Sequence, residues 1–206
     1  ARLPGIRLIG TGNLCSYCTF AYGDGPVLQV GDSWTGTAAI QNCVFRDIGG
    51  SAADPFSAAL DLSYAGAGTT LEASSFYRDA WPLVIGPEIS LDDSNLFHDP
   101  LDPAGLNQVQ AIFIGSFYNA QCAYGASRSL AATEGAFVTS RQIEVMGPAT
   151  LSFGPGAALK FMADVEMFIH PGAALAYDPT TVFTSVRDDS VKGDLDGPTS
   201  PAAAAG

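Results

Sequence analysis

Apolar and polar positions alternate over short stretches along most of this chain, and few stretches follow a helical period. The apolar runs are often β-branched or aromatic, and Gly, Asp, Asn and Pro interrupt them after a few residues. This pattern is typical of many short strands joined by tight turns. Even the strongest helix candidate, "LKFMADVEMFI" at 159–169, alternates at least as well as it follows a helical period. The sequence therefore predicts an all-β protein.

A phenylalanine recurs at intervals close to twenty residues. The octapeptide "CTFAYGDG" from Cys18 resembles "CVFRDIGG" from Cys43, and shorter variants of the motif follow. The recurring positions are Phe20, Phe45, Phe76, Phe97, Phe117 and Phe137, at intervals of 25, 31, 21, 20 and 20 residues. A period in the low twenties predicts a solenoid, in which successive coils stack about 4.8 Å apart and place Phe above Phe.

A β-sandwich with Phe residues recurring by chance is the alternative, and six recurrences favour the solenoid. We predict one right-handed parallel β-helix over residues 1–206, with about nine coils estimated from a period near 22. Residues 1–140 would form the longer Phe coils. Residues 141–206 would form shorter coils, built on "PGAAL" after Pro155 and Pro171, and an acidic C-terminal loop. Pro-Gly suits a tight turn in which Gly takes a positive φ.

The charge of the chain narrows the classes of partner. Lys and Arg total 9 against 21 acidic residues, which gives a net charge of −12. This balance argues against nucleic acid and anionic membranes as partners, because both require a basic surface. No apolar stretch approaches the roughly 18 residues of a membrane span, so we expect no membrane insertion.

Several segments together resemble a known family. "LSFGPGAALKF", "VFTSVRDDSVKGD", and "GIRL" followed by "YCTFAYG" resemble right-handed parallel β-helix proteins of bacterial cell surfaces, within the broad pectate-lyase-like superfamily. The resemblance implies the β-helix fold and a secreted or cell-surface location. It leaves the activity open, because the superfamily contains enzymes, adhesins and structural shafts.

The order of these segments suggests self-association. In the family the Asp-rich loop precedes the "GIRL" strand, whereas here it ends the chain, and joining Gly206 to Ala1 gives a continuous family segment. We therefore expect uncapped ends, and a structural or adhesive unit without enzyme activity. Its terminal coils would pair with copies of itself in a fibre, sheath or tandem array. A segment cut from a longer protein and a complete monomer are the alternatives. The alternative function is a carbohydrate-active enzyme or a polysaccharide-binding module.

Two acidic segments are candidate sites. Asp188, Asp189, Asp194 and Asp196 offer four carboxylates within nine residues, and Asp194-Leu-Asp196-Gly has the alternating character of calcium loops. Ca²⁺ there would rigidify the unit, and a solvated acidic turn is the alternative. For an enzyme, the candidate acid and base are Asp92 and Asp93, with His98 nearby.

Four cysteines allow several uses. "CSYC" at Cys15 and Cys18 lacks the second cysteine pair that a zinc site would have, and no helix follows it as in a redox motif. Stacking would place Cys18 beside Cys43, within disulfide reach, and leave Cys15 to pair with Cys122. Cys15–Cys18 with Cys43–Cys122 is the rival pairing, and buried free thiols are the other alternative.

Overall fold

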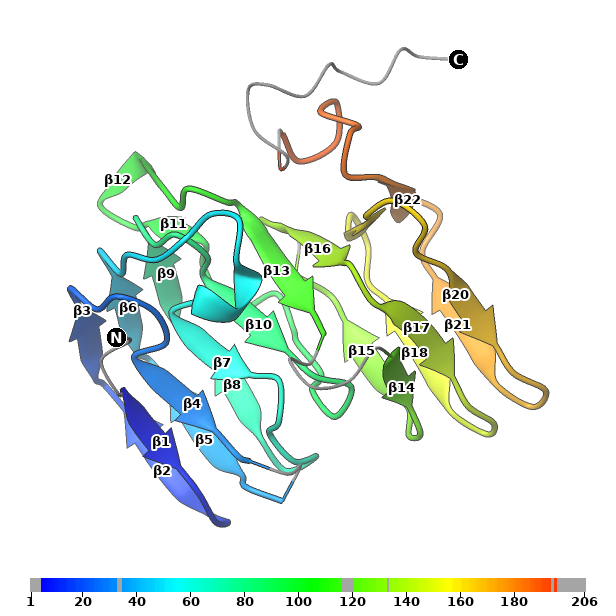
Figure 1. The fold of residues 1–206 in the computed structure, drawn as a ribbon, viewed down its shortest axis with the longest axis horizontal. Helices are drawn as coiled ribbons and strands as arrows, with labels where there is room; N and C mark the ends of the chain where they lie inside the picture. Colours follow the sequence, from blue (N-terminus) through cyan, green and yellow to red (C-terminus); the bar gives the residue numbers. More distant parts are fainter. Residues whose placement is uncertain (1–4, 33–34, 116–120, 133, 194, 196–206) are drawn as a thin grey trace.

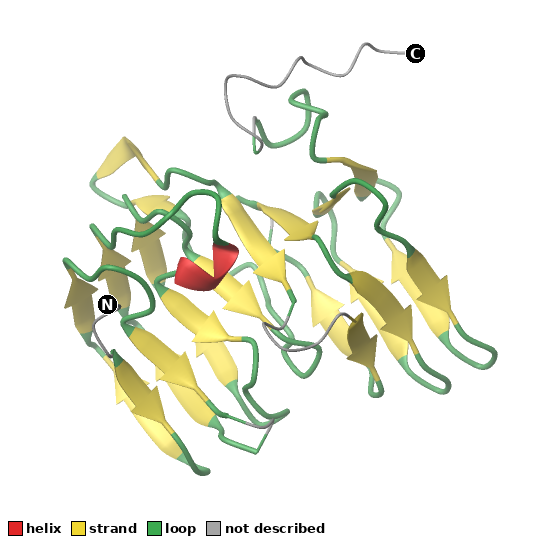
Figure 2. Cartoon of the chain, in the orientation of Figure 1, coloured by secondary structure: helices red, strands yellow, loops and turns green. Residues whose placement is uncertain are grey.

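The chain winds into a parallel β-solenoid. The structure, a computed structural model, describes residues 5–32, 35–115, 121–132, 134–193 and 195. Within these residues nearly all regular structure is strand, and the only helix is one 3₁₀ turn, η1 (Pro55–Ser57) (Figure 2). The coils follow one another along the long axis, from the blue end to the orange end of Figure 1. The prediction of an all-β parallel solenoid is confirmed.

One long sheet runs through every coil. Its eight strands are all parallel and are, in spatial order, β1 (Ile6–Leu8), β4 (Leu28–Val30), β7 (Leu60–Leu62), β10 (Leu83–Ile85), β13 (Ala111–Ile114), β16 (Ala136–Thr139), β19 (Ala158–Phe161) and β22 (Val182–Ser185). Their alternate side chains enter one continuous apolar core that extends from Cys15 to Leu159. The long sheet is therefore the common wall of the solenoid.

Shorter sheets form the other walls, and they change along the axis. The early coils use β2 (Asn13–Ser16), β5 (Ala38–Gln41) and β8 (Thr70–Glu72) in one sheet, and β3 (Thr19–Ala21), β6 (Val44–Arg46) and β9 (Ser75–Tyr77) in another. The late coils use β14 (Gln121–Tyr124), β17 (Gln142–Val145) and β20 (Met167–Ile169), and β15 (Arg128–Leu130), β18 (Thr150–Phe153) and β21 (Ala174–Tyr177). The antiparallel pair β11 (His98–Asp99) and β12 (Asp102–Leu106) projects from the middle of the solenoid.

The coil count is lower than predicted. One register position of the long sheet is occupied by Ile6, Leu28, Leu60, Leu83, Ile112, Phe137, Leu159 and Phe183, so the coils take 22, 32, 23, 29, 25, 22 and 24 residues. This makes about seven coils rather than nine. The estimate was wrong because two coils carry excursions, one with η1 and one with the β11–β12 hairpin.

The aromatic ladder exists, but it is shorter than predicted. Phe20, Phe45, Phe76 and Phe97 stack face to face, with successive ring centroids 4.9, 4.8 and 5.4 Å apart. Phe137 does not continue the ladder, because it lies in β16 of the long sheet, between Ile112 and Leu159. Its spacing of 20 residues matched the period by coincidence. Phe117 lies outside the described residues.

Left-handed residues form the corners of the early coils. Tyr17, Asn42 and Ala73 have φ of 55°, 53° and 49°, and each lies between the second and third strand of its coil. Tyr22, Asp47 and Arg78 have φ of 55–62° after the third strand. Because a single αL residue turns an extended chain sharply, side chains on both sides of the corner point into the core.

Glycine forms the corners of the late coils. Gly156 and Gly172 have φ of 70° and 82°, as predicted for the two Pro-Gly turns. The two turns are different corners, however, since Gly156 joins β18 to β19 and Gly172 joins β20 to β21. The interval between Pro155 and Pro171 is therefore not a coil length, and the prediction of shorter Pro-Gly coils was wrong.

The stack of Phe rings should contribute most of its stability at its middle. We predict that Phe45→Ala lowers the free energy of unfolding by about 3–5 kcal/mol, because the ring is buried and stacked on both faces. Phe20→Ala, the matched control, removes a half-buried ring that stacks on one face. Urea unfolding measures both, and equal losses would contradict the ladder.

A buried carboxyl group lies at one corner of the third coil. Asp79 is fully buried, and its Oδ1 accepts a hydrogen bond from the backbone N–H of Ile48 at 3.0 Å. Its Oδ2 has no hydrogen-bond partner among the described residues. Burial raises the pKa of Asp79 to about 8, and the nearby Asp47 carboxylate raises it further. The group is therefore neutral in the native protein at neutral pH.

This proton makes stability depend on pH. The native state holds a proton that the unfolded chain releases near 3.8, so Asp79 stabilises the fold most in acid. Its contribution falls as pH rises towards 8, by up to about 1.4 kcal/mol per pH unit, and is constant above. We predict that Asp79→Asn removes this slope, whereas the exposed Asp102→Asn retains it. Urea unfolding between pH 4 and 9 measures it, and the same slope in Asp79→Asn as in wild type would contradict the assignment.

Candidate functional site

A groove opens where one wall of the solenoid is interrupted. β8 ends the early sheet, and β15 begins the late sheet on the same wall by pairing with Leu91 through an isolated bridge. Between β8 and the segment around Leu91, side chains replace the backbone ladder. Asn95 Nδ2 donates to Leu71 O at 3.0 Å, and the N–H of Ala73 donates to Ser94 Oγ at 3.0 Å. The missing strand contacts leave a groove of about 320 Å³.

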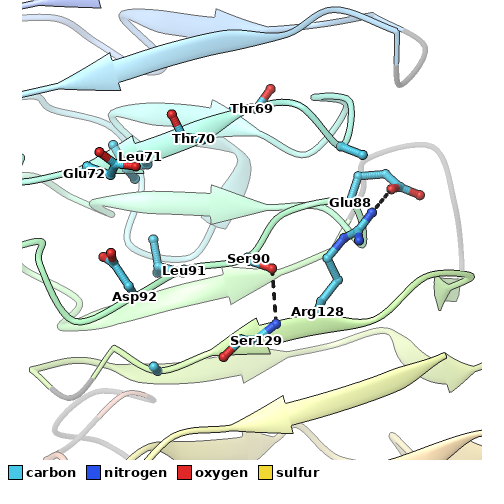
Figure 3. Close-up of a pocket in the computed structure, with 12 residues that line it drawn as sticks. Thr69, Thr70, Leu71, Glu72, Glu88, Ser90, Leu91, Asp92, Arg128 and Ser129 are labelled. Carbon is cyan, nitrogen blue, oxygen red and sulfur yellow. Dashed lines mark hydrogen bonds and ion pairs between the residues drawn. The ribbon is translucent and has the colours of Figure 1, made fainter.

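The lining of the groove is polar and carries charge of both signs (Figure 3). Glu72 and Asp92 line it from opposite sides, and Glu88 forms an ion pair with Arg128. Ser129 donates its backbone N–H to Ser90 Oγ at 3.2 Å. The groove residues include no aromatic side chain, so the groove offers hydrogen bonds without a surface on which a sugar ring could stack.

The predicted acid–base residues are not brought together in this groove. Asp92 lines it and accepts hydrogen bonds from the N–H and hydroxyl of Ser94 at 3.0 and 2.6 Å. His98 lies on β11, in register with the outward positions of β6 and β9, and its Nδ1 is 2.8 Å from Glu134 Oε2. Asp93 follows Asp92 but is not among the groove residues. Carbohydrate binding or cleavage stays a prediction.

The acidic loop after β22 is anchored by a buried lysine. Lys160 points outward from the long sheet and is fully buried, because residues 186–195 cover it. Its Nζ donates to the carbonyl oxygens of Asp188 and Gly193, at 2.8 Å each. The loop therefore packs against an internal cation supplied by the chain itself.

The predicted calcium ligands meet this arrangement only in part. The Asp188 carboxylate accepts hydrogen bonds from Ser190 Oγ at 2.5 Å and Thr184 Oγ1 at 2.8 Å, and these bonds lower its pKa. Asp189 follows it in the same loop. Asp194 and Asp196 lie outside the described residues. Calcium binding stays a prediction, and a melting midpoint unchanged by a chelator would remove it.

Neither predicted disulfide pairing is present, because all four cysteines are free. Cys18 and Cys43 do occupy equivalent positions on adjacent coils, just before the register pair Thr19–Val44. Cys122 lies on β14, four coils beyond Cys15, so pairing Cys122 with Cys15 was wrong. Cys43 is on the second coil, and the rival pairing of Cys43 with Cys122 fails for the same reason.

Both terminal coils expose side chains that are buried in every inner coil. Tyr177 follows Phe153 in register and is 61% exposed, whereas Phe153 is 3% exposed. At the other end, Ile6 precedes Leu28 and is 55% exposed, whereas Leu28 is 1% exposed. Within the described residues no helix covers either end. The two end faces are therefore apolar and flanked by open strand edges.

Comparison of the chain with protein-family models, with curated proteins and with solved structures finds no match. The parallel β-solenoid implied by the family resemblance is confirmed, while membership of the pectate-lyase-like superfamily and a bacterial origin stay predictions. Among the described residues, no helix is long and apolar enough to cross a membrane.

The anchoring role of Lys160 yields a test. We predict that Lys160→Met speeds proteolytic cleavage within residues 186–195, because the carbonyl groups of Asp188 and Gly193 lose their buried donor. The free energy of unfolding should fall by about 1–3 kcal/mol. Lys192→Met, which changes an exposed lysine in the same loop, is the control. Cleavage of Lys160→Met at the wild-type rate would show that the loop does not depend on this anchor.

Proposed function

We propose that this protein is a structural or adhesive solenoid unit whose copies stack end to end. The observation that carries the proposal is the exposure of core positions on both end faces. Ile169, Tyr177 and Phe183 follow buried side chains in register and are 40, 61 and 36% exposed. Apolar surface of this kind, gathered at one face, is typical of an interaction site.

The long sheet supplies the pairing direction. β1 and β22 are the two edges of this sheet, and an open edge can pair with a strand of another chain. When β22 of one copy pairs with β1 of the next, the sheet continues in parallel and the core side chains of the two ends cover one another. The short walls differ between the two ends, so the long sheet sets the register of the contact.

A second copy suits these faces better than a small ligand, because each face spans a whole coil and ends in a strand edge. The net charge of −12 opposes association between copies. Stacking should therefore strengthen with salt, which screens this repulsion. A surface fibre or sheath outside the cell is the setting that we propose for such stacking.

Sedimentation velocity over a range of concentrations tests the proposal. We predict that the wild-type chain forms species larger than a monomer as concentration rises, and more of them at high salt. Tyr177→Glu should remain a monomer, because it places a charge on the apolar end face. Leu101→Glu should associate like the wild type, since Leu101 is 94% exposed on the central hairpin, away from both ends.

A wild-type chain that sediments as a monomer at every concentration and salt would contradict end-to-end stacking. So would an equal loss of association in Tyr177→Glu and Leu101→Glu. Circular dichroism of both variants establishes that each has retained the β-solenoid.

A further inference from the structure

Three cysteines meet at the first end of the core. Cys15 lies on β2, Cys18 follows at the corner before β3, and Cys43 lies at the same corner of the next coil. The sulfur atoms of all three lie within 4.8 Å of one another, and those of Cys15 and Cys43 are 3.9 Å apart. A spacing of three residues would place Cys15 and Cys18 on opposite faces of a straight strand. The αL residue Tyr17 turns the chain so that both thiols face inward.

We propose that Cys15, Cys18 and Cys43 form a binding site for a thiophilic metal ion such as Zn²⁺, with solvent as the fourth ligand. Zinc–sulfur bonds of about 2.3 Å place sulfur atoms about 3.8 Å apart in a tetrahedral site and about 4.0 Å apart in a trigonal one. The measured separations need only small side-chain rotations to reach these values. The second pair of cysteines that the sequence lacks is replaced by one cysteine from the neighbouring coil.

The surroundings of the sulfur atoms suit a closed, soft site. Cys15 and Cys43 are buried and Cys18 is half-buried, so the cluster has one side through which an ion and a water molecule can enter. Thiolate ligands select soft and borderline cations over Ca²⁺ and Mg²⁺. Burial raises the pKa of the Cys15 thiol to about 12, so the bound cation must displace a proton and affinity should rise with pH.

The next coils show that this corner is specialised. The equivalent position is Ser74 on the third coil and Asn95 on the fourth, and these side chains hydrogen-bond along the column. The N–H of Cys43 donates to Ser74 Oγ at 3.2 Å, and the N–H of Ser74 donates to Asn95 Oδ1 at 3.1 Å. Sulfur replaces oxygen only in the first two coils, beside the open end. A metal ion there would fasten the terminal coil to its neighbour.

Titration of the reduced, metal-free full chain with Cd²⁺ tests the site, because each cadmium–thiolate bond adds ultraviolet charge-transfer absorption. We predict saturation at one Cd²⁺ per chain, with the intensity of three bonds, and displacement by Zn²⁺. Cys43→Ser should show two bonds and bind more than about 100-fold more weakly, since loss of an outer-shell partner alone costs about 10- to 100-fold. Cys122→Ser, the matched control, should bind like the wild type, because Cys122 is a buried cysteine four coils away.

Cys18→Ser provides the same test at a half-buried position if Cys43→Ser fails to fold. A reduced wild-type chain without the charge-transfer band would overturn the proposal. So would a band that Cys122→Ser weakens as much as Cys43→Ser does. Neither result bears on end-to-end stacking, which the sedimentation experiment tests separately.

Discussion

In-register stacking of successive coils is the constraint on which this structure depends. Each inward side chain has its main neighbours one coil before and one coil after it, and these lie 22 to 32 residues away along the chain. The Phe20–Phe45–Phe76–Phe97 stack shows the result, with rings at nearly the coil spacing. The same constraint creates the end faces, because an inward side chain in a terminal coil lacks one of its two neighbours.

The chain varies its coils without breaking the stack. The long sheet keeps one register throughout, whereas the short walls change near Leu91. Where backbone pairing is lost between β8 and Leu91, the side chains of Ser94 and Asn95 bridge the two segments. Excursions leave from corners, and residues 186–195 cover the outer face of the long sheet through the buried Lys160. Polar variety is therefore concentrated at corners and on the outside, where candidate sites occur.

The sequence predicted the features that repeat and missed those that depend on three-dimensional neighbours. Repetition of a Cys-x-Phe motif in the early coils was enough to predict parallel stacking and the pairing of equivalent positions. Excursion lengths and the change of walls leave no periodic signal, so the coil count and the place of Phe137 were wrong.

The candidate sites were harder to predict for the same reason. "CSYC" was set aside because a third ligand was not near it in sequence, yet Cys43 lies beside it on the next coil. The roles of Lys160 and Asp79 arise from segments that fold over them, since each is surrounded by residues more than 25 positions away. A basic residue followed by an acidic loop, and an Asp directly after an Arg at a corner, are weak signals in a single sequence.

The central claim is that the long sheet can continue from one copy to the next. Hydrogen exchange of the backbone amides in β1 and β22, measured in dilute and in concentrated samples, tests it most directly. The account predicts that both edge strands become protected at high concentration while the inner strands β10 and β13 stay unchanged. Exchange of β1 and β22 at the same rate in both samples would contradict it.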